Sequence, residues 1–229
     1  MDIDDDKTIA ARLFVHPFLK TDIEPLKGFG LGLAGTYGQV EGEEGLPDDG
    51  AYPSEEQTDV FVYADGVIAD GTQWRLFPQA YHYWGPFGLM AEGGLSSVEL
   101  RQTAAPGASD RVRHTAWQVT GSYPLTGEAA TFRAVTPKRS FDPRQGGWGA
   151  WQLVARYSHL DIDDAVFPFF ADPATSATAV NTWGVGLNWF LNRNVRVSFN
   201  FLRADLEAAP GADLPQDESA FFTRLQLAF

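Results

Sequence analysis

The last twelve residues of the chain, ESAFFTRLQLAF at 218–229, limit its possible folds more than any other segment. Side chains alternate between the two faces of a β-strand, so one face carries Phe221, Leu225 and Phe229 while the other carries Arg224. A soluble protein seldom ends on a strand with an apolar outer face and a terminal aromatic residue. The last strand of an outer-membrane β-barrel does, because it faces lipid and closes the barrel. The segment therefore predicts a chain that lies in a bilayer.

The rest of the composition agrees with strands rather than helices in the membrane. No run of about 18 apolar residues is present, which excludes a helical span, whereas a barrel strand needs only about 9–11 residues, half of which can be polar. The 17 Phe, 7 Trp and 7 Tyr suit a lipid-facing sheet with aromatic girdles. The start, MDIDDDKTIAARLF, lacks the basic and apolar regions of a secretory signal peptide. We therefore expect a mature chain or a fragment of an exported protein.

The charge is strongly acidic, with 30 Asp and Glu against 17 Lys and Arg and a formal net charge of -13. The acidic residues cluster between the apolar-alternating stretches, for example at 41–49 and 161–164. We interpret these clusters as solvated loops; bridging of divalent cations to an anionic outer leaflet is the alternative. No basic patch offsets phosphate repulsion, so nucleic acid is not expected as a partner.

Period-two alternation recurs along the whole chain, and helical periodicity is nearly absent. The pattern predicts an all-β, antiparallel barrel of the transmembrane type. The expected strands are 7–19, 28–41, 71–84, 87–101, 112–126, 147–161, 179–192, 194–207 and 219–229.

The apolar face of these strands is expected to meet lipid. The residues singled out for that face, and for assembly in the case of the terminal aromatic, are Trp183, Trp189, Phe199 and Phe229.

The connections alternate between tight turns and long polar loops, the pattern of a barrel with short periplasmic turns. Residues 127–146 break the rule because they are long and basic on the short-turn side. They either fold into the lumen or cap it, or they form a plain extended turn. Counting back from a periplasmic C-terminus puts Met1 outside, so the odd strand number predicts that the N-terminal part of a larger barrel is missing. A miscounted strand is the alternative, and the weak run 59–63 is where one could hide.

No catalytic constellation is visible: there is no Cys, no G-x-S-x-G, no glycine-rich phosphate loop and no H-E-x-x-H. The four His lie on different strands, and HLDIDD at 159–164 lacks the spacing and glycine of a calcium loop. We expect no enzyme activity, no cofactor and no metal site.

Basic residues recur on the face opposite the lipid-facing one. Rings of arginine that line a water-filled pore attract anions, and a guanidinium fork suits phosphate oxygens. The alternative is that these arginines pair with lumen carboxylates such as Glu92. The candidate pore-lining, anion-attracting residues are Arg12, Arg75, Arg156, Arg196 and Arg224.

Several segments together resemble one family, that of the phosphate-selective porins O and P. They are GAWQLVARYSHLDI, TAWQVTGSYPLTGE, FPQAYHYWGPFGLMAEGGLSSVEL and NTWGVGLNWFLNRNVRVSFNFLRADL, which together contain the motif W-x-VGLNW-(F/Y)-LN-x-N-VR. The resemblance covers most of 71–229 and, more loosely, 7–41.

The resemblance implies a sixteen-stranded outer-membrane barrel, usually trimeric, that passes phosphate or other anions along an array of arginines and lysines. This chain matches strands eight to sixteen, so the family's constriction loop and most lumen lysines are expected in the missing half. We therefore expect a single outer-membrane β-barrel domain over 1–229 and, at full length, a homotrimeric porin for small anions, phosphate among them. A soluble β-barrel or β-sandwich binding module with no transport role is the alternative.

Overall fold

The computed structural model describes residues 7–42, 45–47, 50–54, 57–105, 107–214 and 217–228, and these form one large antiparallel sheet of nine strands. Neighbours in the sequence are neighbours in the sheet, as alternating strands joined by turns and loops require. The nine predicted strands are all present. Their bounds are β1 (Thr8–Val15), β2 (Phe29–Gly42), β5 (Val67–Trp84), β6 (Phe87–Gln102), β7 (Ser109–Pro124), β8 (Ala150–Asp161), β9 (Ala177–Phe190), β10 (Val195–Ala208) and β11 (Asp217–Leu227).

Several predicted strand ends differ from the structure. β5 begins at Val67 rather than at residue 71, and β7 begins at Ser109 rather than at residue 112. Backbone chemistry explains two further differences. The first strand was expected to reach residue 19 but ends at Val15, before Pro17, which has no N–H to donate to a ladder. The strand expected from residue 147 begins at Ala150, because Gly149 has a φ of 72° in the left-handed region. The connections next to these ends, 16–28 and 125–149, are therefore longer than predicted.

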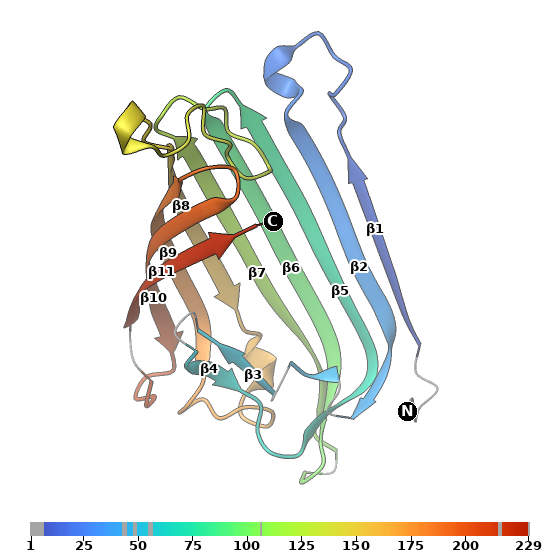
Figure 1. Cartoon of the computed structure of the whole chain (residues 1–229). Helices are drawn as coiled ribbons and strands as arrows, with labels where there is room; N and C mark the ends of the chain where they lie inside the picture. Colours follow the sequence, from blue (N-terminus) through green and yellow to red (C-terminus); the bar gives the residue numbers. More distant parts are fainter. Residues whose placement is uncertain are drawn as a thin grey trace.

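The sheet curls into an open trough (Figure 1). One end, at the bottom of Figure 1, carries the connection between β2 and β5 and is called here the loop end; the other carries the turns at 85–86 and 191–194 together with the longer connections 16–28 and 125–149, and is called the turn end. The strands β1 and β11 form the two edges, and among the described residues they do not pair with each other. Among these residues no helix is long and apolar enough to cross a membrane.

The two faces of the trough differ in chemistry, as period-two alternation requires. The convex face exposes large apolar side chains, Trp183 among them at 39% exposure, and Trp189 and Phe199 share that face. A β-sandwich would cover such a face with a second large sheet, but the described residues add only a two-stranded sheet, which lies on the concave side (Figure 1). Phe229 lies outside the described residues.

The hydrophobic core lies on the concave side at the loop end. There the connection between β2 and β5 turns inward; its described residues, 45–47, 50–54 and 57–66, are called here the inner loop. It holds the strands β3 (Ala51–Pro53) and β4 (Asp59–Val62), which pair with each other. Phe61 is fully buried among Val98, Leu100 and Val112 of the wall and residues 162–171. The described acidic side chains at 41–59, Glu41 and Asp59, are exposed as predicted, but the apolar side chains between the acidic clusters anchor the loop to the wall.

Candidate functional site: the concave wall beneath the inner loop

Strand register places the five candidate arginines on the concave face. Arg156 lies opposite Gly184 of β9, and Val180, on the same face of β9, packs against Val60 of the inner loop. The registers of the other strand pairs place the remaining four arginines on the same face: Arg12 of β1, Arg75 of β5, Arg196 of β10 and Arg224 of β11. The set therefore shares one wall of the trough, but it does not form a single cluster.

Arg196 and Arg224 are the two candidates that the fold brings together. Arg196 lies opposite Gln226 in the β10–β11 ladder, and Arg224 lies opposite Ser198. The two arginines are thus diagonal neighbours, a relation in which residues lie about 7–8 Å apart and their Cβ atoms somewhat closer. Arg196 Nη2 donates to Gln226 Oε1 at 2.6 Å, and its guanidinium lies 5.7 Å from the Phe190 ring centroid. Two positive charges are therefore held side by side near the turn end.

Arg156 lies in a groove of about 570 Å³ between the wall and the inner loop. Pro53, Gln57 and Val60 of the inner loop form one side of this groove, and Arg156 and Ser158 belong to the other. The groove therefore brings a guanidinium and the hydroxyl groups of Ser158 and Thr182 together on one surface.

The inner loop bridges two parts of the wall. Val60 packs against Ala177, Val180 and Ala204 of β9 and β10, whereas Phe61 packs against β6 and β7 on the other side. The hairpin β3–β4 therefore lies across the concave side at the loop end (Figure 1), and its side chains form one side of the groove that Arg156 lines.

A buried hydrogen bond anchors the inner loop. Tyr63 Oη lies 2.7 Å from His114 Nε2 of β7, and His114 Nδ1 accepts from the backbone N–H of Asp163 at 3.2 Å. Because Nδ1 is an acceptor, the neutral ring carries its proton on Nε2 and donates it to the Tyr63 oxygen. Burial raises the pKa of Tyr63, so the phenol stays neutral. Gln73 Nε2 adds a bond of 2.6 Å to the Gly45 carbonyl.

Arg75 lies in a second, smaller cavity beneath the inner loop. This cavity, of about 270 Å³, is lined by Arg75, Tyr52, Tyr63 and His114. Burial raises the pKa of Tyr52, and the positive charge of Arg75 opposes that rise. Arg75 therefore lies on the loop-end side of the wall, apart from the Arg196–Arg224 pair.

Arg12 belongs to a row of hydrogen-bonded side chains across four strands, called here the polar belt: Arg12, Gln79, Glu92 and Gln118. Arg12 Nη2 donates to Gln79 Oε1 at 3.0 Å. Gln79 Nε2 donates to Glu92 Oε1 at 3.2 Å, and Gln118 Nε2 donates to Glu92 Oε2 at 2.6 Å. Arg12 thus reaches Glu92 through an amide rather than directly. The sequence singled out Arg12 and Glu92 but not Gln79, which lies between them, or Gln118 beyond Glu92.

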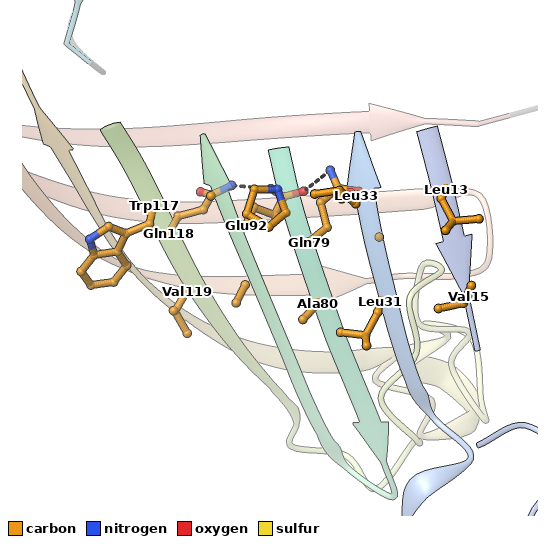
Figure 2. A pocket seen from close by; sticks show the side chains of 14 residues that line it. Leu13, Val15, Leu31, Leu33, Gln79, Ala80, Glu92, Trp117, Gln118 and Val119 are labelled. Carbon is orange, nitrogen blue, oxygen red and sulfur yellow. Dashed lines mark hydrogen bonds between the residues drawn. The ribbon is translucent and has the colours of Figure 1, made fainter. Parts of the chain in front are cut away.

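Figure 2 shows both faces of the wall at the level of the polar belt. Gln79, Glu92 and Gln118 project to one side, and Leu31, Val119 and Trp117 lie on the other. On that convex side a shallow apolar groove of about 540 Å³ runs over the small residues Ala80 and Ala91. The wall therefore separates a hydrogen-bonding surface from an apolar one within a single layer of backbone.

The long basic connection at the turn end also reaches the concave face. Phe132 lies 5.1 Å from the Tyr81 ring, centroid to centroid, and 6.4 Å from Tyr83. Of the two alternatives for 127–146, a fold over the lumen side is the one that these contacts support. The same segment holds Glu128. Burial alone would raise the pKa of that carboxyl, but hydrogen bonds from Thr126 and from the Lys138 backbone, with the Lys138 charge, hold it below its usual range.

Comparison with known proteins finds one family over most of the chain. Residues 51–229 match the family described as phosphate-selective porin O and P. A curated relative, Porin O of Pseudomonas aeruginosa, is 26% identical over 166 residues, which are 72% of this chain and 36% of that relative. The matched region thus spans about a third of the relative's length.

Proposed function

The chain belongs to the phosphate-selective porin O and P family, and from that premise we propose that its concave wall lines the pore of a porin for small anions. Members of this family are outer-membrane channels of Gram-negative bacteria and not enzymes, so the chain is an outer-membrane protein. Its apolar convex face then meets lipid, and its concave face meets water. We extend the proposal to a homotrimer at full length, the assembly that the family resemblance implies.

The observation that carries the proposal is the placement of Arg12, Arg75, Arg156, Arg196 and Arg224 on the wall opposite the apolar face. Low-dielectric walls focus the field of such charges into the lumen, so their local sign outweighs the net charge of the whole chain. Among the described residues, the acidic side chains lie mainly in connections and at strand ends. A small anion that enters therefore meets the arginines along the wall, and Arg12 attracts it least, because Gln79 links Arg12 to the Glu92 carboxylate.

By its position, the inner loop favours selection among anions as well as their attraction into the lumen. It holds the passage narrow next to Arg156, where an anion loses part of its water and gains charge-assisted hydrogen bonds. Phosphate suits this site because a guanidinium fork binds two of its oxygens. We therefore propose phosphate among the conducted anions.

The test is competition between anions in the closed barrel, meaning this chain together with the strands that complete its sheet. Chloride current through single channels in a planar bilayer is recorded while phosphate is added at fixed ionic strength. We expect phosphate to reduce the chloride current in a saturable way, because it occupies the arginine sites longer than chloride does. Sulfate serves as the control for charge. A chloride current that phosphate leaves unchanged would contradict the phosphate assignment and leave general anion conduction in place.

The terminal aromatic residue has a proposed role in assembly. Phe229 resembles the C-terminal aromatic by which outer-membrane barrels reach their insertion machinery. Deleting Phe229 from the complete protein is expected to lower its amount in the outer membrane several-fold, measured by fractionation and immunoblotting. Phe229→Trp keeps an aromatic end and should insert normally. Equal amounts of the deletion variant and the unmodified protein would argue against this role.

A further inference from the structure

Three aromatic rings of the concave face lie flat against glycines of neighbouring strands. Phe14 lies opposite Gly32, Tyr81 opposite Gly30 and Tyr83 opposite Gly88. A Cβ added at any of these glycines would come within 2.7 Å of the facing ring. Only glycine allows this approach, so the sequence keeps the wall free of side chains where the rings lie.

The rings form a continuous surface near the turn end. Phe14 and Tyr81 are 5.5 Å apart, with their planes inclined by 24°, and Tyr83 follows at 5.4 Å from Tyr81. Phe132, from the basic connection, lies close to parallel to Tyr81, at 29°. We call Phe14, Tyr81, Tyr83 and Phe132 the aromatic platform.

The aromatic platform borders the polar belt. A cavity of about 400 Å³ is lined by the four rings and by Arg12, Gln79 and Glu92. This volume falls in the range of about 300–1,000 Å³ that small-molecule sites occupy. Apolar faces and planar hydrogen-bonding groups therefore meet on one surface that opens toward the lumen.

Packing against glycine also stabilises a sheet, since an aromatic ring shields the exposed backbone. That function accounts for Phe14, Tyr81 and Tyr83, but not for Phe132. Phe132 comes from a connection, lies opposite no glycine of the ladder and remains 65% exposed. Covering the exposed face of a phenylalanine is favourable, because it removes apolar area from water. The platform is therefore suited to a solute that stacks on Phe132.

The charges beside the platform indicate which solute. The formal charges of Arg12 and Glu92 cancel, so an anion attracted by Arg12 is repelled by Glu92 nearby. A sugar ring avoids this conflict because it is neutral. Its C–H face packs on aromatic rings, and its hydroxyl groups both donate and accept, as the guanidinium, amide and carboxylate groups of the polar belt require.

We infer that the aromatic platform is a binding subsite for neutral sugar rings in the turn-end half of the pore. The subsite lies apart from the groove at Arg156 and involves no charged solute. It therefore goes beyond anion conduction and does not depend on it.

The test uses maltose, a neutral disaccharide, as the probe of the closed barrel in a planar bilayer. Block of the KCl current gives its dissociation constant, and a polyethylene glycol of equal hydrodynamic radius controls for simple obstruction. Phe132→Ala is expected to raise the maltose dissociation constant about tenfold, the effect of losing one stacking contact. Phe132→Tyr keeps the ring and should keep the block. Anion preference and phosphate competition should be unchanged in both variants, because no charge is altered.

A second variant keeps the test decisive if Phe132→Ala does not assemble. Glu92→Gln is close to isosteric but leaves Arg12 uncompensated, so it should weaken block by maltose and strengthen block by benzoate, an aromatic anion. Maltose block in Phe132→Ala and in Glu92→Gln equal to that of the unmodified protein, or no block beyond that of the polyethylene glycol, would overturn the inference. Block of the unmodified channel by benzoate but not by maltose would assign the platform to aromatic anions and overturn it as well.

Discussion

Replacing Arg156 and Arg196 together with glutamine is expected to lower the preference of the closed barrel for anions by at least about fivefold. A unit charge 4 Å away contributes about 1 kcal/mol even in bulk water, and more beside a low-dielectric wall. Each lost arginine therefore reduces the local anion concentration several-fold. Glutamine retains much of the length and hydrogen-bonding capacity of the side chain. The measurement is the reversal potential across a KCl gradient in a planar bilayer.

The matched control removes the same charge from the other face. Arg101 and Arg203 lie on the convex side, where they pair with Asp70 and Asp217. Replacing both with glutamine changes the net charge equally but leaves the lumen as it was, so the reversal potential should stay near that of the unmodified protein. An equal shift in the two double variants, or full anion preference in the Arg156–Arg196 variant, would contradict the role assigned to the lumen arginines.

Phe61→Ala is expected to release the inner loop and to raise the single-channel conductance. The Phe61 side chain is fully buried, and removing such a ring costs about 3–5 kcal/mol. Most of that loss falls on the packing between the inner loop and the wall, so the loop detaches before the sheet unfolds. The expected signs are a larger unit conductance and slow fluctuations of the open-channel current, as the loop moves in and out of the passage.

A graded series strengthens the test of the inner loop. Tyr63→Phe removes only the hydrogen bond to His114, worth about 1 kcal/mol, and should produce brief fluctuations with a normal main conductance. Phe87→Ala makes the same kind of change on the exposed convex face and should alter neither property. If Phe61→Ala keeps the conductance and noise of the unmodified channel, the inner loop does not narrow the pore.

The nine strands and their two faces were predictable because alternation is a local property. A run such as 181–190 assigns Trp183 and Gly186 to opposite faces whatever the rest of the chain does. The family resemblance and the connection lengths then indicated a barrel. The ends of β1 and β8 were harder to place, because Pro17 and Gly149 act on single residues that a period of two does not reveal.

The run 59–63 was named as a possible extra strand, and β4 lies there. The packing of the inner loop against the wall could not be predicted, because it depends on distant residues. The run VFVY at 60–63 is apolar and short, and acidic residues surround it. It becomes a core segment only when β6 and β7 bring Val98 and Val112 under Phe61. The acidic residues on either side indicated a solvated loop. The short apolar run between them was the better indicator of how the segment packs. His114 was missed for the same reason, since its partner Tyr63 is 51 residues away.

For the candidate site, register determined which residues share the wall but not which of them meet. The placement of the five arginines on one face followed from alternation. The pairing of Arg196 with Arg224, and the separate positions of Arg75 and Arg156, follow from the alignment of strands across the sheet. The aromatic platform likewise needs Gly30 to lie opposite Tyr81, a relation between residues about fifty positions apart that no single-strand pattern contains.

The reversal potential of the unmodified closed barrel tests the central claim most directly. With a KCl gradient across a planar bilayer, a pore lined by these arginines should show a zero-current voltage of the sign set by chloride, despite the acidic total charge of the chain. That voltage should shrink as salt rises, because screening weakens the field of the arginines. A zero-current voltage of the sign set by potassium, or one close to zero at low salt, would contradict an anion-selective lumen on this concave wall.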